Sequence, residues 1–191
     1  MDAVRRAKKH PGREVVFLGV GLETTAPGTA ASVLAAREQG VGNYSVFPMF
    51  RLVEPALRAL IGSEGFSVHG FLCPGHVAVV TGSEHFRFLP EEYGLPAVVS
   101  GFEAGDILYS VWRLAQMRAE GRPALEHEYT PLLRPAGHPA ATSPVPRVLP
   151  PAAPPWPSLG PLPVPAPPLR PLSPSPCAPP PLLPLLLSRP A

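Results

Sequence analysis

The sequence predicts an α/β fold: a small parallel four-stranded sheet flanked by helices, followed by a disordered proline-rich tail. Apolar strand patterns alternate with helical patterns four times before residue 130, which is typical of βα units. Of the 31 prolines, 23 fall at or after Pro131, and no Asp, Glu or Lys follows Glu128. We therefore expect an α/β domain over residues 1–130 and a tail of polyproline II character over residues 131–191.

The first βα unit covers residues 14–40. Val15–Val20 is a continuous apolar run, which predicts a strand that is covered on both faces. A helix is expected to open at Thr24–Pro27 and to end at Gly40, with Thr24 or Thr25 capping its free N–H groups. Such a helix start favours small anionic ligands. The alternative is a plain strand–turn–helix junction that binds nothing.

The remaining strands and helices are predicted from the period-two pattern of strands and the three-to-four-residue spacing of apolar residues in helices. We expect strands at residues 44–47, 68–73 and 96–100, and helices at residues 2–10, 52–61, 83–93 and 105–120. Right-handed crossovers would make the four strands parallel neighbours in one sheet.

Polar side chains follow three of the four predicted strands. Because carboxyl ends of parallel strands share one edge, the sequence predicts a ligand-binding site there. Its candidate residues are Glu23, Thr24, Thr25, His76 and Glu103. Each has a structural alternative: a lone turn histidine is more often structural, and the carboxylates suit solvated loops or salt bridges. No catalytic residue is assigned, since Ser and His are too scattered for a hydrolase triad.

Composition excludes several classes of protein. A net charge of +2 does not indicate a nucleic-acid partner. The segment LPLLLSRPA is too short to span a bilayer, and no signal-peptide pattern opens the chain, so we expect a cytoplasmic protein without a membrane partner. The two cysteines, Cys73 and Cys177, provide neither a metal framework nor an implied disulfide.

Three collinear blocks resemble the central domain of the HypD family of hydrogenase maturation factors: VVFLGVGLETTAPGTA, FLCPGHVAVVTG and PAVVSGFEAGDIL. The resemblance runs from Arg13 to Tyr129, where Glu126–Tyr129 is similar to the family's E-N-Q-Y ending. It implies an assembly scaffold rather than a classical enzyme, which acts with a HypC-type chaperone and a HypE-type cyanide donor. The implied product is the iron-cyanide-carbonyl group of [NiFe]-hydrogenase, and the implied family cofactor is a [4Fe–4S] cluster.

The chain departs from the family pattern in its thiols. The family's Cys-Gly-x-His and Cys-Pro-x-Cys motifs have no counterpart here, and the proline-rich tail stands where the family has its cluster cysteines. We therefore expect no iron or cluster to bind this chain. A tail without acids is also what out-of-frame reading of GC-rich DNA would give, which suggests a truncated or frame-shifted product that is incomplete or inactive alone.

Two other functions remain open from the residues. The first is a small nucleotide- or anion-binding α/β domain that uses the turn after Val20. The second is an interaction module whose proline-rich tail docks on SH3-like grooves, since P-x-x-P spacings such as Pro151–Pro154 occur there.

Overall fold

The computed structural model describes residues 1–129, 133–143 and 145–148. The helices are α1 (Asp2–Lys9), α2 (Ala26–Glu38), α3 (Val53–Ile61), α4 (Gly75–Thr81), α5 (Phe88–Tyr93), α6 (Ala104–Glu120), α7 (Pro139–Thr142) and α8 (Val145–Val148), with a 3-10 turn at Ser83–Phe86. The strands are β1 (Val15–Gly21), β2 (Tyr44–Phe50), β3 (Phe71–Pro74), β4 (Ala97–Ser100) and β5 (Leu125–His127). No helix in this part of the chain is long and apolar enough to cross a membrane.

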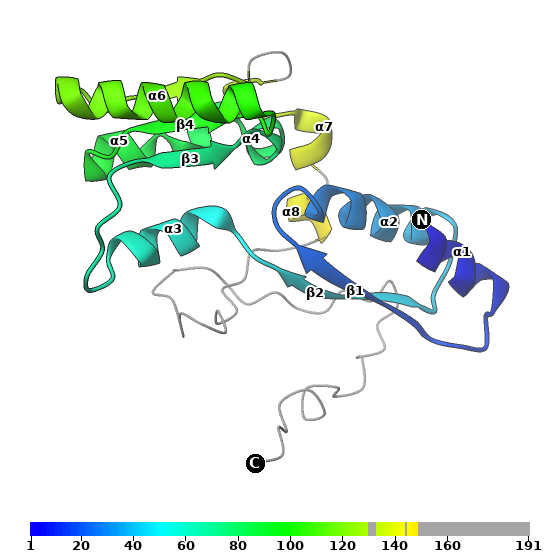
Figure 1. Ribbon diagram of the computed structural model, residues 1–191. Coiled ribbons are helices and arrows are strands. Elements are labelled where there is room, and N and C mark those ends of the chain that lie inside the picture. Colours follow the sequence, from blue (N-terminus) through cyan, green and yellow to red (C-terminus); the bar gives the residue numbers. More distant parts are fainter. Residues whose placement is uncertain (130–132, 144, 149–191) are drawn as a thin grey trace.

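The predicted α/β class with parallel strands is confirmed, but the single four-stranded sheet is wrong. The described strands form a two-stranded sheet, β1-β2, and a three-stranded sheet, β3-β4-β5, and all neighbours are parallel. Figure 1 shows the first sheet beside α1 and α2, and the second beside α4, α5 and α6. The strand count missed β5, because a three-residue strand carries almost no periodicity.

Among the described residues, helices cover only one face of the first sheet. Its core gathers apolar side chains of α1, α2 and β2, including Val33, Tyr44 and Val46. On the opposite face Leu18 and Val20 of β1 remain 57% and 59% exposed. The expected burial of β1 on both faces is therefore wrong, because no described helix layer packs on that second face.

The second sheet has a denser core. All four residues of β4 are buried, and Cys73 and Val99 pack with Phe86 and Leu89 on one face. Side chains alternate along a strand, so Val98 points to the other face, where α6 contacts β3 and β4. The sequence predicts a turn at residues 74–77, whereas the structure starts helix α4 there directly after β3.

Helix α3 connects the two sheets. It follows β2 of the first sheet, and Val53, Leu57 and Ile61 pack against the core of the second. Arg58 anchors it to α5: its guanidinium donates to both carboxylate oxygens of Glu92, at 2.6 and 2.8 Å. The same guanidinium lies 4.3 Å from the centroid of the Phe88 ring. Because the guanidinium is both ion-paired and stacked on a ring, it fixes the orientation of α3 relative to α5.

The first residues of the expected disordered tail pack on the domain. The carbonyls of Arg134 and Pro135 accept hydrogen bonds from the N–H groups of Ser83 and Glu84, at 3.1 and 3.3 Å. Helix α7 contacts both α2 and α4, and α8 places Val148 in the first core with no exposed surface. Helical structure at these positions was not expected from the proline content. The disorder expected for residues 149–191 lies outside the described residues and stays a prediction.

Candidate functional site

The second sheet aligns two of the predicted site residues at one edge. Pro74 at the end of β3 is in register with Ser100 at the end of β4. His76 comes two residues after β3, and Glu103 comes three residues after β4. Because the strands are parallel neighbours, both side chains leave the sheet at its carboxyl edge, which is where open α/β sheets bind ligands.

His76 lies in the first turn of α4 and is exposed. Its ring centroid is 5.1 Å from that of Phe102, with the ring planes tilted by 40°. Phe102 belongs to the segment after β4 and is 66% exposed. The contact therefore joins the ends of two strands and leaves the imidazole open to a ligand.

A glycine makes this close approach of α4 possible. A Cβ at Gly75 would lie 2.7 Å from Cδ1 of Tyr129 and 2.8 Å from the carbonyl oxygen of Ser100. Both distances are shorter than carbon contacts allow. Gly75 thus lets the start of α4 sit directly against β4 and the Tyr129 ring.

Glu103 is the N-cap of α6. It forms a capping box with Asp106, in which Asp106 Oδ2 accepts a hydrogen bond from the Glu103 N–H at 3.2 Å. This arrangement satisfies donors that a helix start leaves free. Glu103 is exposed, so its position is fixed by the helix while its carboxylate stays accessible.

Two further residues at this edge were not among the predicted site residues. Glu128 Oε2 accepts a hydrogen bond from the Gly101 N–H at 3.3 Å, and the Tyr129 ring packs against Gly75 and Gly101. Both follow β5, which is parallel to β4. The strand-end argument would have found them if the short β5 had been recognised.

The other predicted residues lie in the first sheet, in the turn between β1 and α2. Glu23 is only 8% exposed, and its Oε1 accepts a hydrogen bond from the Val53 N–H at 2.6 Å. Its Oε2 is buried and makes no hydrogen bond to the described residues. Glu23 thereby places a carboxylate at the positive end of α3.

Thr24 and Thr25 occupy the same turn, and the expected side-chain cap is wrong. Thr25 is the N-cap of α2, but neither residue makes a side-chain capping hydrogen bond there. Capping by Ser or Thr requires an extended backbone, whereas Thr25 has helical angles of φ −90° and ψ −27°. Pro27 does lie in the first turn, as predicted.

The structure therefore divides the five candidates into two groups. Glu23, Thr24 and Thr25 belong to the first sheet, and His76 and Glu103 to the second. Among the described residues, no hydrogen bond, ion pair or ring contact joins the groups. The prediction that all three turns share one sheet edge is wrong, because the strands do not form one sheet.

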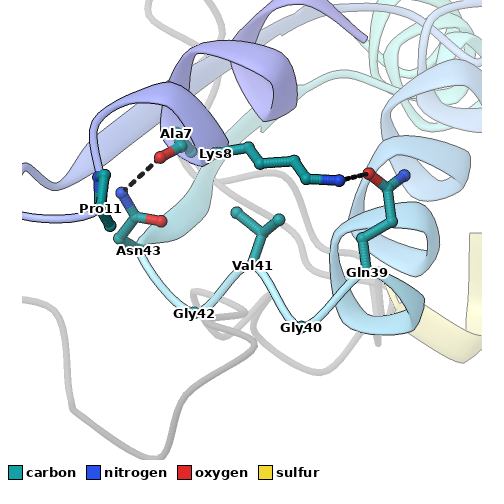
Figure 2. A pocket seen from close by; sticks show the side chains of 8 residues that line it. All are labelled: Ala7, Lys8, Pro11, Gln39, Gly40, Val41, Gly42 and Asn43. Carbon is teal, nitrogen blue, oxygen red and sulfur yellow. Dashed lines mark hydrogen bonds between the residues drawn. The ribbon is translucent and has the colours of Figure 1, made fainter.

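A cavity of about 420 Å³ lies away from all five candidates (Figure 2). It is at the opposite, amino end of β2, where Lys8 Nζ donates to Gln39 Oε1 at 3.5 Å. Asn43 Nδ2 donates to the carbonyls of Ala7, His10 and Arg13, at 2.7–3.0 Å, so its amide holds the chain together. The lining residues are Ala7, Lys8, Pro11, Gln39, Gly40, Val41, Gly42 and Asn43.

Cys73 is the one cysteine within the described part of the chain. It is 2% exposed, and burial raises its pKa to about 12. The neutral thiol is therefore the form at physiological pH, and it is a poor ligand for iron. No group of three or more His, Cys, Asp or Glu within residues 1–129, 133–143 and 145–148 has a geometry that suits a metal ion.

Comparison of the sequence with known proteins identifies the family of this chain. A family model described as "HypD: Hydrogenase formation hypA family" matches residues 1–171. The chain is 43% identical over 129 residues to hydrogenase maturation factor HypD of Rhodobacter capsulatus, covering 68% of this chain and 34% of that protein. Against HypD of Escherichia coli K12 it is 36% identical over 138 residues, covering 72% and 37%.

A third relative is a putative hydrogenase expression/formation protein of Methanocaldococcus jannaschii. It is 34% identical over 137 residues, covering 72% of this chain and 38% of that protein. The chain thus spans little more than a third of the length of these curated relatives.

Proposed function

Because this chain belongs to the HypD family, we propose that it serves in the maturation of [NiFe]-hydrogenase. Its part is to supply one side of the scaffold on which the iron-cyanide-carbonyl group is assembled. The observation that carries the proposal is the placement of His76 and Glu103 at the carboxyl ends of the adjacent strands β3 and β4. Family membership supports a role in hydrogenase maturation, and the shared strand edge is the position at which we propose that the substrate binds.

The chemistry of the edge suits a substrate with cyanide ligands. The exposed imidazole of His76 can donate a hydrogen bond from a ring N–H to a cyanide nitrogen. Glu103 is a poor contact for an anion, so its role is to fix the segment that carries Phe102 against His76. The Thr24 and Thr25 hydroxyls lie at the separate turn between β1 and α2, which Glu23 holds to α3, and are not counted among the donors of this edge.

The family's iron–sulfur cluster does not fit this chain. A [4Fe–4S] cluster takes four cysteine thiolates, whereas the sequence contains two cysteines, of which Cys73 is buried as a neutral thiol. The chain would act together with a second protein that supplies the cysteine ligands, a HypC-type chaperone and a HypE-type cyanide donor.

A segment exchange tests the proposal. Residues 13–129 replace the matching segment of Escherichia coli HypD, and hydrogenase activity is measured in cells that lack HypD. We expect the hybrid to restore activity, and His76→Ala in the hybrid to lower it at least about tenfold, since one positioned donor is typically worth that much. The matched control is His69→Ala, an exposed histidine outside the site, which should leave activity unchanged. A hybrid that accumulates normally but lacks activity contradicts the proposal.

A further inference from the structure

The exposed face of the first sheet is a continuous apolar surface. Val16, Leu18 and Val20 of β1 alternate along the strand and are exposed on this face. Phe47 and Met49 of β2 are in register with Leu18 and Val20 and are half-buried. No charged residue occurs in either of these two strands. An uncovered apolar surface of this kind marks a place where another segment or protein binds.

The position at which the described chain ends indicates what can cover this face. Val148 lies in the first core with no exposed surface, and the helix that carries it, α8, contacts α2. Figure 1 shows α8 beside α2, on the side of the first sheet that the helices cover. Residues 149–191 therefore start next to the first sheet, and not next to the exposed Leu108 and Trp112 of α6.

The sequence that follows Val148 suits an apolar face. Residues 149–169 include no charged residue, and ten of residues 150–168 are proline, a composition typical of polyproline II. This helix has three residues per turn, so that residues three apart share one edge. Trp156, Leu159 and Leu162 have this spacing. In a polyproline II helix they would form one apolar edge about 19 Å long.

We propose that residues 156–162 of the same chain cover the exposed face of β1 and β2, with Trp156, Leu159 and Leu162 turned toward the sheet. Neither side of this contact carries a charge, so docking desolvates no ion. Proline-rich segments lose little conformational entropy on docking, and they favour surfaces with aromatic rings, such as the one that Phe47 provides. Because the segment is tethered to the sheet, its effective concentration is high and a small contact area suffices.

The connecting segment is long enough for this contact. Residues 149–155 span about 20 Å as a polyproline II chain. The far face lies roughly 10 Å beyond the core that holds Val148, and neighbouring strands are only about 5 Å apart, so the edge of a two-stranded sheet is near. The stripe from Val16 to Val20 is about 13 Å long, which accommodates Leu159 and one of its two apolar neighbours.

Trp156 supplies the first test. In the full chain with Trp112→Phe it is the remaining tryptophan, and its fluorescence reports whether the ring is covered. We expect emission at a shorter wavelength than in urea, with weaker quenching by acrylamide. Leu18→Glu places a charge in the face and should move the emission to the wavelength of the unfolded chain. The matched control is Leu108→Glu, at an exposed apolar residue of α6, which should leave the emission unchanged.

A variant of the docking segment separates release from misfolding of the sheet. Leu159→Glu leaves β1 and β2 untouched, so the circular dichroism spectrum should be unchanged while Trp156 is released as in Leu18→Glu. Trp156 emission that already matches the urea value in the folded chain overturns the proposal. A covered Trp156 that responds to neither Leu18→Glu nor Leu159→Glu also overturns it. Release by Leu108→Glu alone would place the segment on α6 and reject the proposed face.

A spin label locates the segment and identifies the chain to which it belongs. Ser158→Cys in a Cys177→Ser background takes a nitroxide label, because the other thiol, Cys73, is buried. The amide signal of Leu18 should lose intensity and recover when the label is reduced, whereas that of Leu108 should not change. In a mixture of isotope-labelled chain without nitroxide and spin-labelled chain without isotope, the Leu18 signal should stay intact. Its loss in that mixture would show that a second copy supplies the segment, and would overturn docking within one chain.

Discussion

The Glu23 carboxylate accepts a hydrogen bond of 2.6 Å from the backbone N–H of Val53, and this contact links the turn between β1 and α2 to the start of α3. Since Val53, Leu57 and Ile61 of α3 pack against the second core, this hydrogen bond ties the turn after β1 to the helix that packs on the second sheet. The residue thus orients its neighbours instead of facing a ligand with both oxygens.

Removing this carboxylate should destabilise the fold. Glu23→Ala deletes the acceptor of the part-buried Val53 N–H, and we expect the free energy of unfolding to fall by about 1–3 kcal/mol in urea titrations. Glu23→Gln keeps an acceptor oxygen and should lose less. The control is Glu64→Gln, at an exposed glutamate, which should change little. A Glu23→Ala chain as stable as wild type would rule out this role.

Gly75 should not tolerate a side chain. In Gly75→Ala the new Cβ meets a backbone carbonyl that cannot turn away, and we expect a loss of about 1–3 kcal/mol in the free energy of unfolding. Gly28→Ala is the matched control, because nothing lies within 4 Å of its Cβ position in α2, and it should be neutral or stabilising. Equal stability of the two variants would contradict the close packing of α4 on Tyr129.

Gly137 tests whether the segment after Tyr129 belongs to the folded unit. Its φ is +74°, and a Cβ there would lie 2.2 Å from the Val80 carbonyl oxygen. Gly137→Ala should therefore cost more than the 1–2 kcal/mol, roughly, that left-handed strain alone costs. Gly121→Ala has a φ of +64° and open space around it, so it reports the strain alone. If both variants unfold at the same urea concentration, the segment does not pack on α4 as described.

The Arg113–Glu126 pair predicts a dependence of stability on pH. Arg113 Nε donates to Glu126 Oε2 at 2.7 Å, and this bond holds the Glu126 pKa below its ordinary value of 4.5. A lowered pKa contributes stability above pH 4.5 that is lost as the pH falls through the folded value. The stability difference between wild type and Glu126→Gln should thus be present at pH 7 and shrink toward pH 3. A difference independent of pH would contradict the pairing.

Cys73 should be unreactive in the folded chain. Its thiol is buried with a pKa of about 12, so a Cys177→Ser chain should react with a thiol reagent only after denaturant is added. The Cys73→Ser chain keeps only Cys177, and its rate of reaction with the reagent serves for comparison. Prompt reaction of the Cys177→Ser chain at pH 7 would show that the β3 core opens readily.

Much of the local structure was readable in advance because it depends on neighbours in the chain. The strand and helix of residues 15–38, the helix at α6 and the strand β4 lie within a few residues of their predicted bounds. Helix α4 was missed because only the packing of Gly75 against Tyr129, 54 residues away in sequence, lets a helix start there. The three-residue β5 was missed because its pairing with β4 defines it more than its own pattern does.

The sequence by itself determined the α/β class, the family resemblance and the identity of the polar residues after each strand, because periodicity and short motifs are local. Only the tertiary structure decided that the strands form two sheets, that Glu23 turns toward α3, and that His76 and Glu103 share an edge without Thr24 and Thr25. Strand pairing depends on contacts between distant segments, and nothing in the local pattern states which strand accepts which neighbour.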